Sequence, residues 1–243
     1  MDSYGPRRLC VSVCSLVYCT DSHNIANNSM RTSTKQSRRR GRPPSYDRDV
    51  ALGAIRDVFW DRGFSATSLD DIATAAGMNR PSLYGAFGDK REMYLAVLQK
   101  FAVESGRELQ KALEAPTLHE ALEAFYLRAI QDYLSGHGSP RGCLVICTAV
   151  TEATGDPAIR SALAAILGEI DSMLTVRIAK SQAEGDRCTG ANAKVLARIA
   201  ASVLHSVAVR ARAGARRSEL LTIARATADL IVGLTPDVQA QGR

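Results

Sequence analysis

Residues 67–90 read Thr67-Ser-Leu-Asp-Asp-Ile-Ala-Thr-Ala-Ala-Gly77-Met-Asn-Arg-Pro-Ser-Leu-Tyr-Gly-Ala-Phe-Gly-Asp-Lys90, and this stretch decides the fold. Apolar residues recur three and four apart on both sides of Gly77, which predicts two short helices joined by a glycine turn. The second helix carries its polar and basic residues near its start. Such a pair is typical of a helix-turn-helix, whose second helix places its leading end in a DNA groove.

The expected helix ends follow from the local chemistry. Thr67 or Ser68 can accept a hydrogen bond from the free backbone N–H groups of the first helix, and Asn79 can cap the second. Asp89 with Glu92 forms a capping-box pattern that begins a third, longer helix. All three starts are therefore predicted from neighbouring residues alone.

An amphipathic helix is also expected upstream, over residues 50–59 with Gly63 closing it. It completes a three-helix unit of about 45 residues, which is small but within the size of an independent domain. A helical hairpin inside an ordinary bundle would show the same periodicity. The segment in front of the unit favours the DNA-binding reading.

That segment is a basic arm. Between Arg31 and Arg48 the sequence has seven basic residues and one acid, a local charge of +6 that equals the formal net charge of the whole chain. Like charges and the prolines at 43 and 44 disfavour a helix, so we expect a disordered strand that can enter a minor groove. A solvated tail or a targeting-like basic run is the alternative. The expected DNA contacts in the arm are Arg38, Arg39, Arg40 and Arg42.

The order and spacing of these motifs resemble the N-terminal domain of TetR-type (TetR/AcrR) transcriptional regulators. The resemblance covers roughly residues 46–98 and includes Gly63-Phe64, residues 67–77, Leu83-Tyr84, Phe87 and Asp89-Lys90. It implies an all-α protein with three parts. These are a leader and basic arm at 1–44, a helix-turn-helix domain at 45–93, and a larger helical effector-binding and dimerisation domain at 94–243.

The resemblance also implies roles for single residues. Tyr84 and Lys90 would bind phosphates, Thr67 and Ser68 would anchor the first helix to the DNA backbone, and Asn79, Arg80 and Ser82 would approach base edges. The planar fork of Arg80 matches the two acceptors of guanine, although a phosphate contact is an equal alternative. Many relatives have a small residue where Arg80-Pro81 stands, so we expect a stiffer and more basic reading surface here.

The remaining chain is helical in pattern, with helices expected at 118–134, 142–154, 158–183, 191–213 and 218–234. The last two carry many alanines, which let helices approach closely. They could simply close the core of one subunit. The resemblance instead implies that they pair with the same helices of a second copy, and a homodimer would place two reading heads on a palindromic site.

Composition excludes several classes of protein. The chain has 243 residues, 46% of them hydrophobic, and no run long and apolar enough to span a membrane. Phosphate loops, nucleophile elbows and zinc-protease motifs are missing, and the four histidines are scattered. We therefore expect a cytoplasmic DNA-binding regulator, not an enzyme, with no cofactor or metal. Its expected partners are double-stranded operator DNA, a small-molecule effector and a second copy of the chain.

By resemblance, the regulator would be a repressor that leaves operator DNA when an effector enters the helical body. Few aromatic residues lie there, which favours a modest apolar ligand. The candidate pocket residues are Phe101, Phe125, Tyr133, Cys143 and Cys147, although side chains of these types more commonly belong to the core. A DNA-binding protein that responds to no effector is an alternative, and it would bind random duplex nearly as well as any site.

Cysteines suggest a second alternative. Cys143 and Cys147 are four apart and would share one face of a helix, and Arg141 beside a helix start could lower a thiol pKa and make a redox or electrophile sensor. Free cysteines are more commonly buried apolar residues.

The first 29 residues fit none of these patterns. Arg7-Arg8 and the apolar run 9–19 resemble a secretory signal without a clean cleavage site. We expect that Met30 is the natural start and that residues 1–29 are not native, the alternative being a disordered tail.

Overall fold

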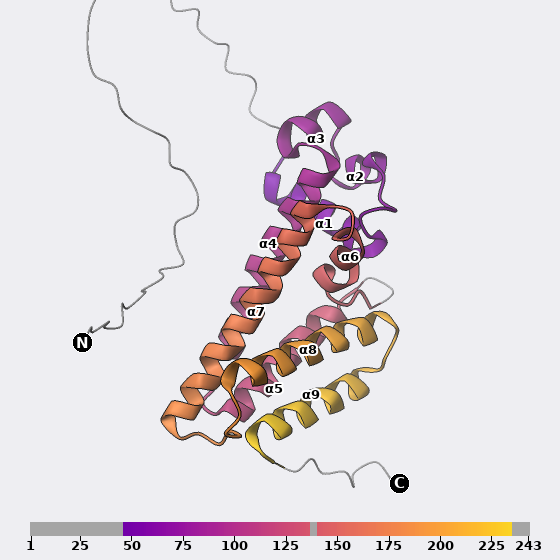
Figure 1. The fold of residues 1–243 in the computed structure, drawn as a ribbon. Helices are drawn as coiled ribbons and strands as arrows, with labels where there is room; N and C mark the ends of the chain where they lie inside the picture. The colour runs from indigo at the N-terminus through magenta and orange to yellow at the C-terminus, as the bar shows by residue number, and fades with distance from the viewer. Residues whose placement is uncertain (1–45, 137–139, 235–243) are drawn as a thin grey trace, which may run out of the picture. The chain divides into compact units, whose positions relative to one another are not determined.

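The computed structural model describes residues 46–136 and 140–234, so the leader and the basic arm, including Arg38, Arg39, Arg40 and Arg42, lie outside the described residues. Within these ranges all regular structure is helical, which confirms the all-α fold (Figure 1). The helices are α1 (Arg48–Arg62), α2 (Leu69–Ala75), α3 (Arg80–Phe87), α4 (Lys90–Ala112), α5 (Leu118–Tyr133), α6 (Leu144–Glu152), α7 (Pro157–Glu184), α8 (Ala193–Arg212) and α9 (Arg217–Val232).

Helices α1 to α3 form the head that the sequence predicted. Its core joins Ile55 and Phe59 of α1, Ile72 of α2 and Leu83 of α3, all without measurable exposure. Tyr94 of α4 completes this core, because its ring meets Phe59 edge to face at 5.0 Å between centroids. Burial of these apolar side chains stabilises the packing of three short helices. Each of these helices would be only marginally stable in isolation.

Helix α4 connects the head to the body. It begins with the predicted capping box, in which Asp89 and Glu92 bind each other's backbone N–H groups. It packs against α1 near its start, and against α5 and α7 further on. Since α4 runs without a break across the expected domain boundary at residues 93 and 94, the boundary stays a prediction.

The body is formed by α5 to α9, with α7 beside α8 and α5 beside α9 (Figure 1). Alanines 197, 200, 201, 208 and 211 are buried along α8 and let its neighbours approach closely. The phenol of Tyr126 on α5 is buried with them and donates a hydrogen bond to the Ala200 carbonyl at 2.9 Å. These alanines therefore contribute to the core of a single subunit.

A buried arginine closes the far end of α4. The Arg177 side chain on α7 is 9% exposed and donates from Nε to the Leu113 carbonyl at 2.9 Å and from one terminal nitrogen to the Ala115 carbonyl at 3.1 Å. Carbonyls at a helix end have no partner within the helix, so a charged donor stabilises them there. The end of α4 is thereby fixed to α7.

Candidate nucleic-acid interface and effector cavity

Side-chain caps fix the geometry of the helix-turn-helix. Ser68 accepts from the Asp71 backbone N–H at 3.1 Å in a full capping box, and Asn79 Oδ1 accepts from the Ser82 N–H at 2.8 Å. Between the two helices, Gly77 has a φ of 61°, in the left-handed region that glycine adopts without strain. The predicted caps are therefore present, and the two capping residues, Ser68 and Asn79, are exposed to solvent.

The outer face of α3 carries exposed polar side chains. Arg80, Ser82 and Tyr84 are all exposed, whereas Leu83 and Phe87 point into the core of the head. Tyr84 exposes 44% of its surface although it is a large aromatic residue. An exposed tyrosine beside an arginine at a helix start is typical of a surface that binds phosphates and bases.

Arg80 is not an isolated cation. Its Nε and one terminal nitrogen donate to the two carboxylate oxygens of Asp70 at 2.8 and 2.7 Å, a bidentate pair that joins α3 to α2. The arginine holds the pKa of Asp70 below its ordinary value, first through this hydrogen bond and then through its charge. Asp70 and Arg80 are ten residues apart in the sequence and no local pattern joins them, so the sequence analysis missed this pair.

Thr67 differs from its expected role as a backbone anchor. Its side chain is buried, and its hydroxyl donates to the Gly63 carbonyl at 2.6 Å. This bond closes the loop between α1 and α2 and leaves the hydroxyl unavailable to a phosphate in this conformation. The expectation for Thr67 is corrected for that reason: it supports the loop, whereas its neighbour Ser68 is exposed.

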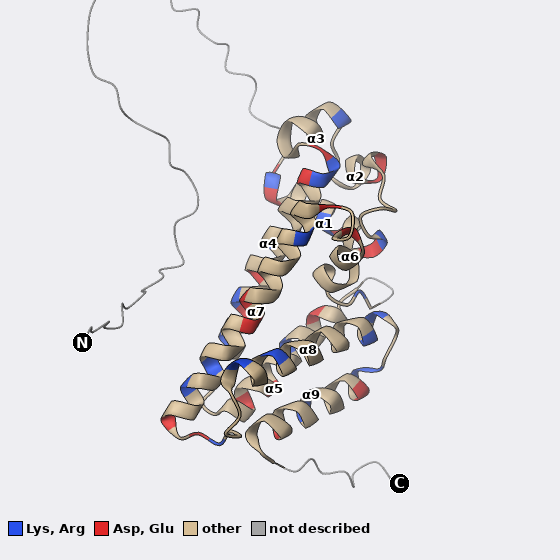
Figure 2. Ribbon diagram, viewed as in Figure 1, with Lys and Arg blue, Asp and Glu red and all other residues tan. Residues whose placement is uncertain are grey.

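Two further cations lie over aromatic rings of the head. The Lys90 ammonium is 4.4 Å from the Phe64 ring centroid, and the Arg48 guanidinium is 5.0 Å from the Phe87 ring centroid. Partial burial lowers the pKa of Lys90. Figure 2 shows basic and acidic residues mixed on these helices, so the described part of the head is not uniformly positive. Arg48 was counted only as part of the arm, and its place against α3 was missed.

A hydrogen-bonded junction links the head to the body. The Trp60 indole N–H at the end of α1 donates to the Gly142 carbonyl at 3.1 Å. Arg212, the last residue of α8, donates from one nitrogen to the Trp60 and Arg141 carbonyls at 3.1 and 3.0 Å. The Arg141 side chain pairs with Asp57 of α1 at 3.2 Å. The end of α1 is thus fixed by the loop before α6 and by α8.

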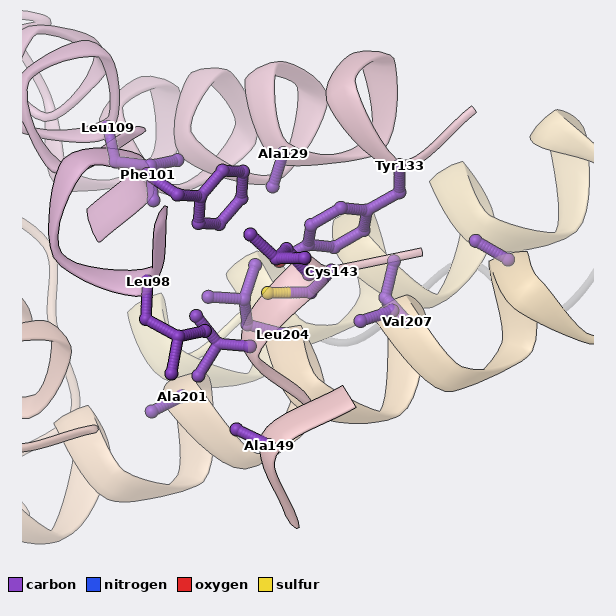
Figure 3. Close-up of a cluster of buried hydrophobic side chains, with 14 of the residues drawn as sticks. Leu98, Phe101, Leu109, Ala129, Tyr133, Cys143, Ala149, Ala201, Leu204 and Val207 are labelled. Carbon is purple, nitrogen blue, oxygen red and sulfur yellow. The ribbon is translucent and has the colours of Figure 1, made fainter. Parts of the chain in front are cut away.

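An apolar cavity of about 60 Å³ lies beside this junction, between α4, α5, α6, α7 and α8. Phe101 and Tyr133 face Cys143 in its wall, together with Ala129 and Leu204 (Figure 3). Three of the five candidate pocket residues therefore meet in one place. Phe125 and Cys147 do not line the cavity: Phe125 is fully buried in the body, and the Cys147 sulfur lies 4.0 Å from the Ala208 carbonyl oxygen of α8.

The cysteines also differ from the sensor hypothesis. Cys143 caps α6 instead of lying within it, and burial raises the pKa of its thiol to about 11. Burial also raises the pKa of Cys147. Arg141 cannot lower either value in the expected way, because its guanidinium is paired with Asp57 and Asp61 of α1. Proximity in sequence predicted a contact that the side chain does not make.

Neither a metal-binding cluster nor a membrane-spanning helix is found among the described residues. In residues 46–136 and 140–234 no three His, Cys, Asp or Glu side chains are grouped so as to hold a metal ion. In the same ranges, every helix is too short or too polar to cross a bilayer.

Comparison with known proteins agrees with this architecture. Residues 51–97 match the family model for bacterial regulatory proteins of the tetR family, and residues 120–227 match the model for the tetracyclin repressor-like C-terminal domain. The chain is 31% identical over 192 residues to the transcriptional repressor ComR of Escherichia coli K12, covering 77% of this chain and 90% of ComR. It is 37% identical over 113 residues to the transcriptional activator FasR of Mycolicibacterium smegmatis, covering 42% of this chain and 52% of FasR.

A solved structure extends the likeness to the whole fold. A cysteine mutant of the TetR family transcriptional regulator CifR, complexed with 26 bp double-strand operator DNA, superposes with a TM-score of 0.71 at 32% identity, covering 77% of this chain and 98% of CifR. A helix-turn-helix head on a helical body defines a DNA-binding transcriptional regulator. The chain belongs to the TetR family.

Proposed function

We propose that this regulator is a repressor that binds operator DNA as a homodimer and leaves it when a small molecule occupies the cavity. The exposed face of α3 supports operator binding, and so does the likeness to CifR, which was solved on operator DNA. The name of ComR supports repression. In this proposal residues 45–93 read DNA and residues 94–243 bind the effector and the second subunit.

In this proposal, different residues of α3 and its neighbouring segments contact base edges and phosphates. We assign Asn79, Arg80 and Ser82 to base edges, since they stand at the exposed start of α3. Ser68, Tyr84 and Lys90 are assigned to phosphates, which fix the register of the head on the duplex. The arm residues Arg38, Arg39, Arg40 and Arg42 would add contacts in the adjacent minor groove.

The observation that carries effector release is the continuity between the cavity and the head. Cys143 lines the cavity, and the preceding residue, Gly142, accepts the hydrogen bond from Trp60 of α1. Leu204 also lines the cavity, on the same helix whose last residue, Arg212, binds the α1 carbonyls. A ligand that displaces the start of α6 or shifts α8 must therefore move α1.

The cavity wall indicates what such a ligand is. Its lining is mostly apolar, with rings of Phe101 and Tyr133 and few polar groups. Its volume of 60 Å³ is well below the roughly 300–1,000 Å³ of ordinary small-molecule pockets, so an effector of ordinary size must enlarge it. A ligand that needs this expansion prefers the expanded state, and a preference of a few kcal/mol is enough to shift the equilibrium away from DNA.

An exposed apolar face supports the homodimer. Val195, Ile199 and Val209 of α8 and Leu230 of α9 are each more than half exposed. Apolar residues in a row on one helix face are typical of an interface. We expect a dimer by light scattering at micromolar concentration, and Ile199→Arg should yield monomers that bind a palindromic site more weakly. A monomeric wild-type protein would contradict the proposal.

The test of effector release begins with selection of bound sequences from random duplex DNA, followed by a screen of small neutral organic molecules for release. Ala129→Val fills part of the cavity and should keep operator binding while it weakens release. The matched control is Ala165→Val, on an exposed position of α7 outside the cavity lining. Equal release in both variants would show that the effector binds elsewhere.

A further inference from the structure

The function proposed above assigns Arg80 to a base edge but gives no role to the ion pair that Arg80 makes with Asp70. Both side chains are largely exposed, at 54% for Arg80 and 72% for Asp70. Exposed ion pairs contribute little to folding stability, because water screens them and both side chains lose freedom. Stability alone therefore does not account for a bidentate pair at the start of the recognition helix.

The donor geometry of the pair leaves one edge of the guanidinium available. Arginine has five N–H donors, one on Nε and two on each terminal nitrogen. Asp70 uses the side edge, which consists of Nε and one terminal nitrogen. The end edge, formed by the two terminal nitrogens, has no partner among residues 46–136 and 140–234. This available edge presents two parallel N–H donors, which can bind O6 and N7 of a single guanine.

We infer that Asp70 is a positioning residue for DNA recognition: it holds the Arg80 guanidinium by its side edge so that the end edge reads one guanine. The inference rests on the proposed function, in which α3 contacts base edges. Arginine loses rotational freedom when it binds, and a carboxylate that fixes it beforehand lowers that cost. The recognised chemistry is a G·C base pair presented in the major groove.

The pair also changes the charge that Arg80 offers to DNA. A free arginine at a helix tip attracts any phosphate, which strengthens binding to all sequences equally. Asp70 compensates that charge, so Arg80 gains less from phosphates and relatively more from a base edge. Asp70 thus raises discrimination between sites while it lowers affinity for random DNA.

The experiment compares variants on the site selected by the wild-type protein and on the same site with its preferred G·C pair exchanged. Asp70→Ala should reduce discrimination at that base pair about tenfold, strengthen binding to random duplex and steepen the dependence of log affinity on log salt by about 1. Asp70→Glu keeps a carboxylate and should restore part of the discrimination. In an Arg80→Ala background, Asp70→Ala should change discrimination no further.

Asp49→Ala is the matched control. Asp49 is the second residue of α1, as Asp70 is of α2, and it pairs with Lys100 of α4. The Asp49→Ala substitution removes one negative charge from the head, as Asp70→Ala does, and should leave base preference unchanged. Wild-type discrimination in Asp70→Ala, with unchanged thermal unfolding, would overturn the inference. If the wild-type protein selects no site at all, the proposed function itself fails.

Discussion

The head and the body are both made of amphipathic helices, yet they present their functional side chains in opposite ways. On α3, Arg80, Ser82 and Tyr84 stand exposed within one short helix, held by caps a few residues away. The cavity lies inside the body, and its wall takes residues from five helices. We expect substitutions on the head to change DNA affinity with little loss of stability. Substitutions around the cavity should change stability and release together.

The largest expected effect is the low reactivity of the buried Cys143 thiol towards alkylating reagents. Because only the thiolate reacts and the pKa of Cys143 is about 11, its alkylation should be very slow at pH 7 and rise about tenfold per pH unit, a hundredfold by pH 9. Peptide mass spectrometry after iodoacetamide labelling measures the rate. Fast labelling at pH 7 that levels off below pH 9 would restore the sensor hypothesis.

Gly142→Ala should have the next largest effect, because Gly142 lies at the junction between the head and the body. Gly142 has a φ of 66°, and an added Cβ would lie 2.6 Å from the Ala208 carbonyl oxygen. Strain and overlap together should cost about 3 kcal/mol of unfolding free energy. Gly155→Ala is the control, because no atom lies within 4 Å of its added Cβ. Equal unfolding midpoints in urea would show that the junction is not tightly packed.

Two tyrosines, one buried and one exposed, allow a direct comparison of stability with DNA affinity. The Tyr94 hydroxyl is buried and bonds the Thr148 hydroxyl at 2.6 Å, which links α4 to α6. Tyr94→Phe should cost about 1 kcal/mol of stability and leave operator affinity unchanged below the unfolding transition. Tyr84→Phe should do the reverse, with unchanged stability and severalfold weaker operator binding. Loss of stability in Tyr84→Phe would break the distinction between exposed and buried side chains.

The smallest expected effect is electrostatic. Arg91 of α4 pairs with Asp156, the N-cap of α7, and lowers the pKa of that carboxyl to about 2. A depressed folded-state pKa stabilises the protein above the unfolded pKa, near 4, and this contribution is lost as pH falls towards 2. Asp156→Asn keeps a cap, so its unfolding temperature should be slightly lower at pH 6 and should converge with wild type near pH 2. A constant difference across this range would exclude a charge effect.

The same contrast explains what the sequence could predict. Ser68, Asn79 and Asp89 cap helices through neighbours three residues away, so their roles follow from local chemistry. The head and the helical body were predicted for that reason. Arg141 shows the limit, because it lies two residues from Cys143 but its side chain pairs with α1. The cavity and the Asp70–Arg80 pair depend on how separate helices meet, which no local pattern records.

Trp60 is the single tryptophan of the chain, and it lies at the junction, with its indole N–H bonded to the Gly142 carbonyl and the Arg141 guanidinium 5.6 Å from its ring centroid. Tryptophan fluorescence therefore comes from one known position. Any rearrangement that opens this contact to solvent should shift the emission to longer wavelength. The unlabelled protein thus carries its own optical reporter of communication between its two regions.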